Sequence, residues 1–178
     1  METESASWPE HYDNLEVQVL APRHYYPSYS RKDDYSKKIV DSKNDDLSDY
    51  FFEEIKAIFP ELPFTPDLIV IVPASKLGRF STTMVSLCGK LSNALNIPFD
   101  KLIQRVREGK KLTSCPTQEE RYDSVNGAFK VTRELNGENI VLLDDTKVSG
   151  VTLPECAKEL KKTGASDVVA ICLGINKS

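Results

Sequence analysis

Hydrophobic residues follow each other without interruption at three places in this chain. Leu68 to Val72 and Ile140 to Leu143 are unbroken apolar runs, and the stretch 167–175, DVVAICLGI, is almost entirely apolar. Runs of this kind are typical of strands buried on both faces, as in a parallel sheet. A shorter stretch at 15–20 alternates between apolar and polar residues, which also predicts a strand.

Other hydrophobic residues recur at the spacing of an amphipathic helix. One helix is predicted to begin near Asp46 as its N-cap, and a second one over residues 84–95, where Asn96 and Pro98 stop it. A third begins near Leu153. Thr152 and Glu155 have the spacing of a capping box, and Gly164 is suited to the residue after the helix. The first two helices have these apolar positions: Leu47, Tyr50, Phe51, Ile55, Ile58 and Phe59, then Met84, Leu87, Cys88, Leu91 and Leu95.

The order of these elements indicates the fold class. Further strands are predicted at 101–106 and 125–132, separated by a long polar loop at 107–124, while residues 1–45 read as irregular apart from 15–20. Strands that alternate with helices predict a three-layer α/β fold with a mostly parallel central sheet.

Composition narrows the function classes. The chain has 178 residues, of which 40% are hydrophobic and 28% are charged, and these values fit one compact globular domain. The net charge of -4 gives no case for direct nucleic-acid binding. No apolar run approaches the roughly 20 residues that span a membrane, and the first residues lack a signal-peptide core. The four cysteines show no CxxC spacing, so reduced cysteines in a cytoplasmic protein are expected.

Two adjacent carboxylates, Asp144 and Asp145, follow a buried run directly and precede a helix start. Ser149, Gly150 and Thr152 offer hydroxyls and approachable N–H groups beside a helix N-terminus, which together make a cradle for an anion such as phosphate. Carboxylates beside a phosphate would bind sugar hydroxyls or a magnesium ion. The chemistry therefore indicates a sugar-phosphate site, and the alternative is that the aspartates only cap a surface turn.

The same stretch, LLDDTKVSGVT, resembles the phosphoribosyl-pyrophosphate (PRPP) motif of type I phosphoribosyltransferases. Three further stretches, PDLIVIVPASKLGR, QEERYDSVNGAFKV and LKKTGASDVVAICL, resemble the ComF-like (competence-protein, GntX-related) branch of that family. The resemblance extends over roughly residues 66–175. It implies a type I phosphoribosyltransferase-like fold with residues 61–178 as the core and residues 1–60 as a small N-terminal hood with one helix.

The resemblance also assigns roles to residues. Asp144 and Asp145 would bind the ribose, with Mg²⁺ carried by PRPP lying near them. Three loops complete the site. The 5′-phosphate loop comprises Thr146, Lys147, Val148, Ser149, Gly150 and Thr152; the pyrophosphate loop comprises Ala74, Ser75, Lys76 and Arg79; the basic residues of a flexible lid are Arg107, Lys110, Lys111 and Arg121.

Two main functions remain open at this point. The first is transfer of phosphoribosyl from PRPP to a nitrogenous acceptor with release of pyrophosphate. The second is non-enzymatic PRPP or nucleotide binding in regulation or DNA uptake. A phosphatase-like or receiver-like use of the aspartates is disfavoured by the Ser-Gly-Val-Thr stretch that follows them. The acceptor is unknown, a homodimer is left open, and no membrane partner is expected.

Val148 departs from the pattern of the family. The ComF-like branch usually has Thr there, and hypoxanthine–guanine enzymes place an acidic residue at this position. Valine accepts no proton, so efficient use of hypoxanthine or guanine is not expected.

Overall fold

The computed structural model describes residues 1–7, 16–26, 33–108, 115–147 and 150–176 of the chain. A seven-stranded sheet lies at its centre in the order β1-β2-β9-β8-β4-β5, with β3 also paired to β9. All its pairs are parallel except β1 with β2. These strands are β1 Glu2–Ser7, β2 Glu16–Ala21, β3 Arg23–Tyr25, β4 Leu68–Ile71, β5 Phe99–Asp100, β8 Ile140–Lys147 and β9 Val168–Asn176.

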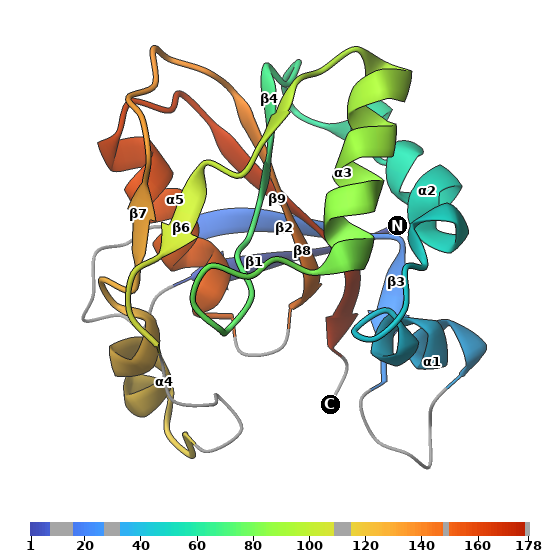
Figure 1. Ribbon diagram of the computed structural model, residues 1–178, viewed down its shortest axis with the longest axis horizontal. Helices are drawn as coiled ribbons and strands as arrows, with labels where there is room; N and C mark the ends of the chain where they lie inside the picture. Colours follow the sequence, from blue (N-terminus) through green and yellow to red (C-terminus); the bar gives the residue numbers. More distant parts are fainter. Residues whose placement is uncertain (8–15, 27–32, 109–114, 148–149, 177–178) are drawn as a thin grey trace.

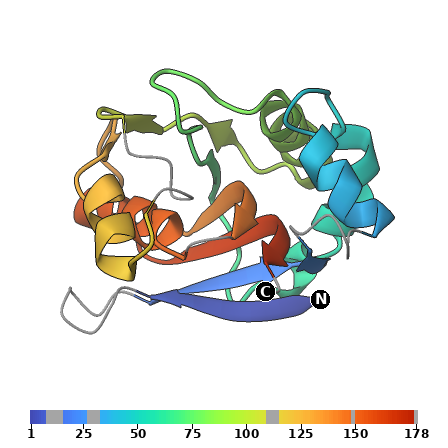
Figure 2. The ribbon, with the colours of Figure 1, turned by 90° about the horizontal axis from the view of Figure 1, so that it is seen from below.

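Helices cover both faces of this sheet, which gives three layers (Figures 1 and 2). The expected α/β class with a mostly parallel sheet is therefore confirmed. On one face lies α5, Thr152–Lys162, and on the other lie α1, Asp34–Asp41, α2, Ser48–Lys56, and α3, Thr82–Leu95. The short helix η2, Phe59–Glu61, follows α2.

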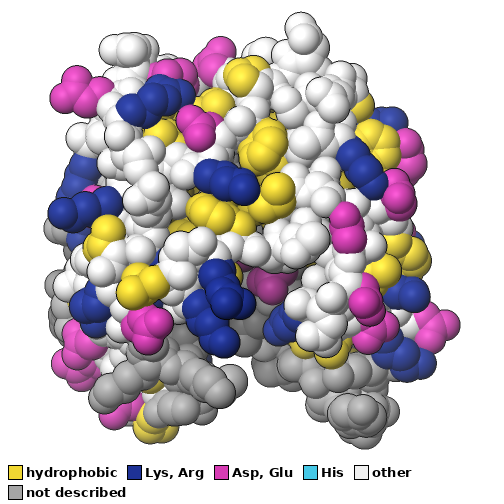
Figure 3. Space-filling view, in the orientation of Figure 1, with side chains coloured by type: hydrophobic (Ala, Val, Ile, Leu, Met, Phe, Trp, Pro, Cys, Tyr) yellow, Lys and Arg dark blue, Asp and Glu magenta, His cyan; other side chains and the backbone are white. Residues whose placement is uncertain are grey.

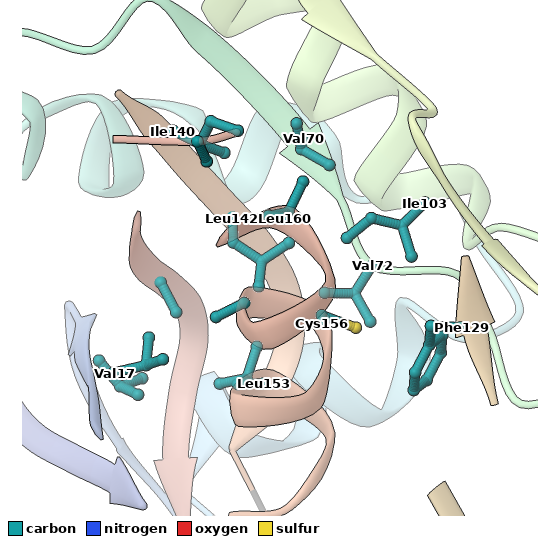
Figure 4. Packing of buried hydrophobic residues seen from close by; sticks show 14 of the residues in the cluster. Val17, Val70, Val72, Ile103, Phe129, Ile140, Leu142, Leu153, Cys156 and Leu160 are labelled. Atoms are coloured by element: carbon teal, nitrogen blue, oxygen red, sulfur yellow. The ribbon is translucent and has the colours of Figure 1, made fainter. Parts of the chain in front are cut away.

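The central strands are apolar throughout because each face packs against helices. In β4, Leu68 and Val70 belong to the hydrophobic cluster on the α5 side, while Ile69 and Ile71 belong to the cluster on the α3 side. Figure 4 shows the first cluster, in which Leu153, Cys156 and Leu160 of α5 lie beside Leu142, Val70 and Val72. Phe129 and Ile103 lie at its edge.

Phe129 and Ile103 come from a second, smaller sheet. It consists of β6, Ile103–Arg105, paired antiparallel with β7, Phe129–Val131, and α4, Gln118–Val125, precedes β7. The helix α4 corrects the expectation of one long loop over 107–124. Its apolar periodicity is weak, but Thr117 and Glu120 form a complete capping box at its start.

The N-terminal third is more regular than expected, since β1, β3 and α1 all lie within residues 1–45. The β1 sequence ETESAS has no apolar pattern, as suits an edge strand that pairs on one side only. The helix α1 buries Tyr35 and Ile39, and the Tyr35 hydroxyl donates a hydrogen bond to the Leu173 carbonyl at 2.7 Å. Both elements thus depend on tertiary contacts that local sequence does not reveal.

Residues 1–60 and the remaining chain share one sheet, because β2 and β3 both pair with β9. The expected boundary at residue 60 falls within η2 and remains a prediction. The helix expected near Asp46, with Asp46 as its N-cap, begins at Ser48, and its N-cap is Leu47. The Asp46 carboxylate accepts a hydrogen bond from the Ser48 N–H at 2.9 Å.

Candidate functional site

The site lies where β4 ends beside β8, which continues further, to Lys147. Ile71 is in register with Leu143, and the Val72 N–H donates to the Leu143 carbonyl at 2.9 Å. The chain leaves these strand ends through residues 73–81 and 148–151, toward the starts of α3 and α5. Ligands of open α/β sheets bind at this carboxyl edge. In Figure 3 this lower side is hollowed, with an acidic patch in the hollow and basic side chains around it.

Asp144 and Asp145 lie within β8, which continues to Lys147 instead of ending at Leu143 as predicted. Successive strand residues point to opposite faces. Leu142 packs on the α5 side and Leu143 on the α3 side, so Asp144 is directed toward α5 and Asp145 toward the opposite layer. Both side chains are half-buried.

Each aspartate accepts a hydrogen bond from the backbone N–H of the next residue. Asp145 N donates to Asp144 Oδ1 at 2.8 Å, and Thr146 N donates to Asp145 Oδ1 at 2.6 Å. The Thr146 hydroxyl lies 3.3 Å from the same Asp145 oxygen. These bonds fix the two carboxylates, which suits a constellation that orients a ligand.

Burial raises the pKa of Asp144 well above its usual range, and repulsion by Asp145 raises it further. The pKa of Tyr25 is also raised, first by burial and then by the charge of Asp145. A carboxyl group held in this way gains from a nearby cation, because the cation stabilises its ionised form. Asp144 therefore fits a position beside a metal ion or another positive group.

The pyrophosphate loop predicted from sequence is an exposed turn closed by its own backbone. Ala74 N donates to the Arg79 carbonyl at 2.8 Å, Arg79 N donates to the Lys76 carbonyl at 3.3 Å, and Gly78 has a φ of +64°. No hydrogen bond from the N–H groups of residues 75–78 is found within the described structure. Ser75, Lys76 and Arg79 are exposed. The loop thus offers free backbone donors and two cations to an anion.

The start of α5 has no side-chain cap among the described residues, and its N-cap is Val151. The predicted capping box of Thr152 and Glu155 is wrong, because Glu155 is buried and its Oε1 accepts from the Gly127 N–H at 2.7 Å. Gly150, with a φ of +71°, turns the chain into the helix. A helix N-terminus without a side-chain cap is suited to an anion, and the half-buried Thr152 is the first residue of this helix.

Two residues of the predicted 5′-phosphate loop, Val148 and Ser149, lie outside the described residues, as does the side chain of Lys147. The same holds for Lys110 and Lys111 of the predicted lid. The described lid residues have local partners. Arg107 Nη2 donates to the Asp123 and Asn126 carbonyls at 3.1 and 2.8 Å, and Arg121 Nε donates to the Cys115 carbonyl at 2.9 Å. Arg121 lies on α4, which corrects its assignment to a flexible loop.

Sequence reasoning missed Arg105, the last residue of β6. Its Nε donates to the carbonyl of Ala74, in the pyrophosphate loop, at 3.2 Å. Burial lowers the pKa of Arg105, and the negative charge of Asp144 acts in the opposite direction. The signal was an arginine in the strand pattern KLIQRV, just before the predicted lid, but nothing in that pattern shows which loop lies beside it.

Within the described residues, no group of three or more His, Cys, Asp or Glu side chains is placed to hold a metal ion. The four cysteines are free and buried. No helix in the described part of the chain has the length and apolar character needed to cross a membrane.

Comparison with known proteins finds related sequences. Over 114 residues the chain is 27% identical to an amidophosphoribosyltransferase of Staphylococcus aureus (strain Mu50), and 31% identical to one of Methanothermobacter thermautotrophicus. Each match covers 64% of this chain. These sequence relatives are phosphoribosyltransferases. The match spans only 22% of each relative's length.

A solved structure is also similar to this chain. It is the glutamine PRPP amidotransferase of B. subtilis complexed with ADP and GMP, with 22% identity and a TM-score of 0.46 over 67% of this chain and 25% of that one. No family model matches the chain.

Proposed function

We propose that this protein binds PRPP together with Mg²⁺ and transfers the phosphoribosyl group to a nitrogenous acceptor, releasing pyrophosphate. The observation that carries the proposal is the arrangement at one sheet edge. A fixed acidic pair on β8 lies near two segments that are suited to an anion. The N–H groups of residues 75–78 form no hydrogen bond within the described structure, and the start of α5 has no side-chain cap there. PRPP has the matching order of groups, with a hydroxylated ribose between a 5′-phosphate and a pyrophosphate. The names of the sequence relatives point the same way.

In this proposal each part of the edge has one task. Asp144 and Asp145 bind the ribose hydroxyls, while the start of α5, with Gly150 and Thr152, binds the 5′-phosphate. Ser75 and Lys76 belong to the turn that binds pyrophosphate. Magnesium prefers oxygen ligands and is commonly held by one or two carboxylates together with substrate phosphates. The raised pKa of Asp144 fits such an ion, which would neutralise charge on the phosphates.

The reaction breaks the bond between the anomeric carbon and the pyrophosphate oxygen, and pyrophosphate leaves with the electron pair. The acceptor nitrogen forms the new bond to that carbon and then loses a proton. The protein's contribution is positioning and stabilisation of charge. The relatives' name, amidophosphoribosyltransferase, points to transfer to a simple nitrogen nucleophile, so ammonia leads the candidates. With valine at 148, hypoxanthine and guanine are not expected to serve.

The ComF-like branch, a cytoplasmic location and a homodimer also remain proposals. The branch rests on the motif resemblance, and the location rests on the reduced cysteines. The assembly state is open, and none of the three affects the chemistry of the site.

The test is incubation of the purified protein with PRPP, Mg²⁺ and a panel of acceptors, with pyrophosphate release as the readout. The panel contains ammonia, glutamine, adenine, uracil, orotate, hypoxanthine, guanine and xanthine. We expect release with one acceptor outside the last three, and none without Mg²⁺. PRPP binding without release for any acceptor would contradict transferase activity and favour the regulatory alternative. A kcat/KM of about 10⁴ M⁻¹s⁻¹ or more with hypoxanthine or guanine would contradict the interpretation of Val148.

A further inference from the structure

Glu155, in the first turn of α5, is a carboxylate buried among apolar residues. Its side chain is 1% exposed, and its neighbours Leu153 and Cys156 belong to the hydrophobic cluster on the α5 side. Its Oε1 accepts a hydrogen bond from the Gly127 N–H at 2.7 Å, but its Oε2 has no hydrogen-bond partner in the described structure and lies 3.8 Å from Lys158 Nζ. An apolar side chain of similar volume is often at least as stabilising at such a position. Stability alone therefore does not explain a glutamate here.

The Glu155 hydrogen bond fastens the turn between α4 and β7 to α5. Gly127 belongs to this turn and has a positive φ of 66°. Its neighbour Asn126, the C-cap of α4, accepts a hydrogen bond from Arg107 Nη2 at 2.8 Å. The end of α4 is thus joined to α5 through one buried side chain.

The helix α4 also packs near the start of α5 and lies next to it (Figures 1 and 2). Tyr122 and Val125 of α4 belong to the same hydrophobic cluster as Val151 and Leu153. In Figure 1, α4 lies on the lower side of the molecule, which is the side of the carboxyl edge. The placement of α4 therefore matters on the side where the ligand would bind.

The first turn of α5 has two connections, one to the ligand and one to α4. At its N-terminus Val151 is the N-cap, without a side-chain cap among the described residues. The Glu155 N–H donates to the Val151 carbonyl at 3.4 Å, which is long for a backbone hydrogen bond, so this turn is only weakly closed by itself. An anion that accepts hydrogen bonds from the first N–H groups would hold the turn in place. The Glu155 carboxylate leaves the helix from this same turn.

We propose that Glu155 is a positioning residue that couples occupation of the 5′-phosphate site to the placement of α4. This inference rests on the proposed function, because it needs a ligand at the start of α5. A ligand that orders the first turn fixes the Glu155 carboxylate, and the carboxylate then fixes Gly127 and the end of α4. The competing explanation is that Glu155 anchors the turn equally with and without ligand. The two explanations differ in whether a ligand at α5 changes the local stability of α4.

The experiment measures backbone hydrogen exchange with and without GMP, which has a ribose and a 5′-phosphate but no pyrophosphate. It compares the wild-type protein with Glu155→Met, which has a similar length but no acceptor oxygen, and with Glu155→Gln, which keeps one. Thr117→Val is the control, because it weakens the start of α4 without changing the Glu155 bond. GMP is added above the Kd that calorimetry gives for each variant. The two regions compared are the first turn of α5 and residues 118–127.

We expect GMP to slow exchange in both regions of the wild-type protein, Glu155→Gln and Thr117→Val, by about 10-fold over residues 118–127. In Glu155→Met the slowing should be confined to α5. Slowing confined to α5 in the wild-type protein, or undiminished slowing over 118–127 in Glu155→Met, would overturn the inference and leave the 5′-phosphate site intact. If Glu155→Met does not fold, Glu155→Ala replaces it with the same two outcomes. A wild-type protein that does not bind GMP would contradict the assigned 5′-phosphate site, and the proposed function would fail together with this inference.

Discussion

Two helices of this protein begin with the same sequence signature and end up with different N-termini. Both α4 and α5 begin near a Thr-x-x-Glu stretch, Thr117 to Glu120 and Thr152 to Glu155. At α4 the two side chains form a reciprocal capping box. At α5 the N-cap is Val151, and Glu155 turns inward to the Gly127 N–H instead.

The difference follows from where each helix start lies. The start of α4 is stabilised by its own side chains, which form the capping box. The start of α5 lies at the carboxyl edge beside the acidic pair. There a side-chain cap would occupy the N–H groups that a phosphate needs. We infer that α5 is left without a cap because a ligand completes it.

The largest effect on folding is expected at Glu155. The Glu155→Ala substitution removes a buried acceptor and leaves a void between α5 and the turn before β7. The free energy of unfolding should fall by about 2 kcal/mol. Urea denaturation measures it, and Glu155→Gln, which keeps an acceptor oxygen, should lose much less. Equal stability of the alanine variant and the wild-type protein would show that Glu155 has no anchoring role.

Replacing either threonine by valine, which has nearly the same shape, tests the comparison directly. Thr117→Val should lower the unfolding free energy by about 1 kcal/mol because a cap is lost, with ligand affinity unchanged. Thr152→Val should leave stability almost unchanged and weaken binding of GMP or PRPP by roughly 1–3 kcal/mol. Denaturation gives the unfolding free energy of each variant, and calorimetry gives its ligand affinity. The comparison fails if both substitutions affect stability alike and neither affects binding.

The smallest effect concerns the pH dependence of stability at Asp144. Its pKa in the folded protein is raised, so the folded state holds the proton more tightly than the unfolded chain does. Stability associated with this group is full below the ordinary carboxyl pKa of about 3.9 and is lost as pH rises toward the raised value.

The Asp144→Asn variant has no ionisable group at this position, so it does not lose this stability as the pH rises. We therefore expect the melting temperature of the variant to exceed that of the wild-type protein at neutral pH, with the gap narrowing as the medium becomes acidic. Melting curves across pH without ligand or Mg²⁺ measure it. A gap that stays constant with pH, or a less stable variant at pH 7, would contradict the raised pKa.

The strands and helices found from sequence are those whose burial leaves a local pattern. β4 and β9 are covered on both faces and read as apolar runs, and α3 shows its stripe and stops at Asn96, which has a positive φ of 54°. By contrast, β1 is a polar edge strand, and α1 depends on Tyr35 reaching β9. Their stability arises from distant partners, so sequence periodicity could not indicate them.

The same distinction between local pattern and distant contacts applies to the candidate site. The acidic pair and the two loops lie in contiguous motifs, so the sequence could indicate them. The opposite directions of Asp144 and Asp145 could not be predicted, because they depend on β8 continuing past Leu143. Arg105 approaches the loop from another sheet, 31 residues away along the chain from Ala74.

The central claim is that the carboxyl edge of β4 and β8 binds PRPP. Its most direct test is calorimetry of PRPP with and without Mg²⁺ on the wild-type protein and on Asp145→Asn, with Asp167→Asn, at the opposite end of the sheet, as the control. The account predicts Mg²⁺-dependent binding by the wild-type protein and the control, weakened by roughly 1–3 kcal/mol in Asp145→Asn. Absence of binding by the wild-type protein, or equal affinity in all three, would contradict it.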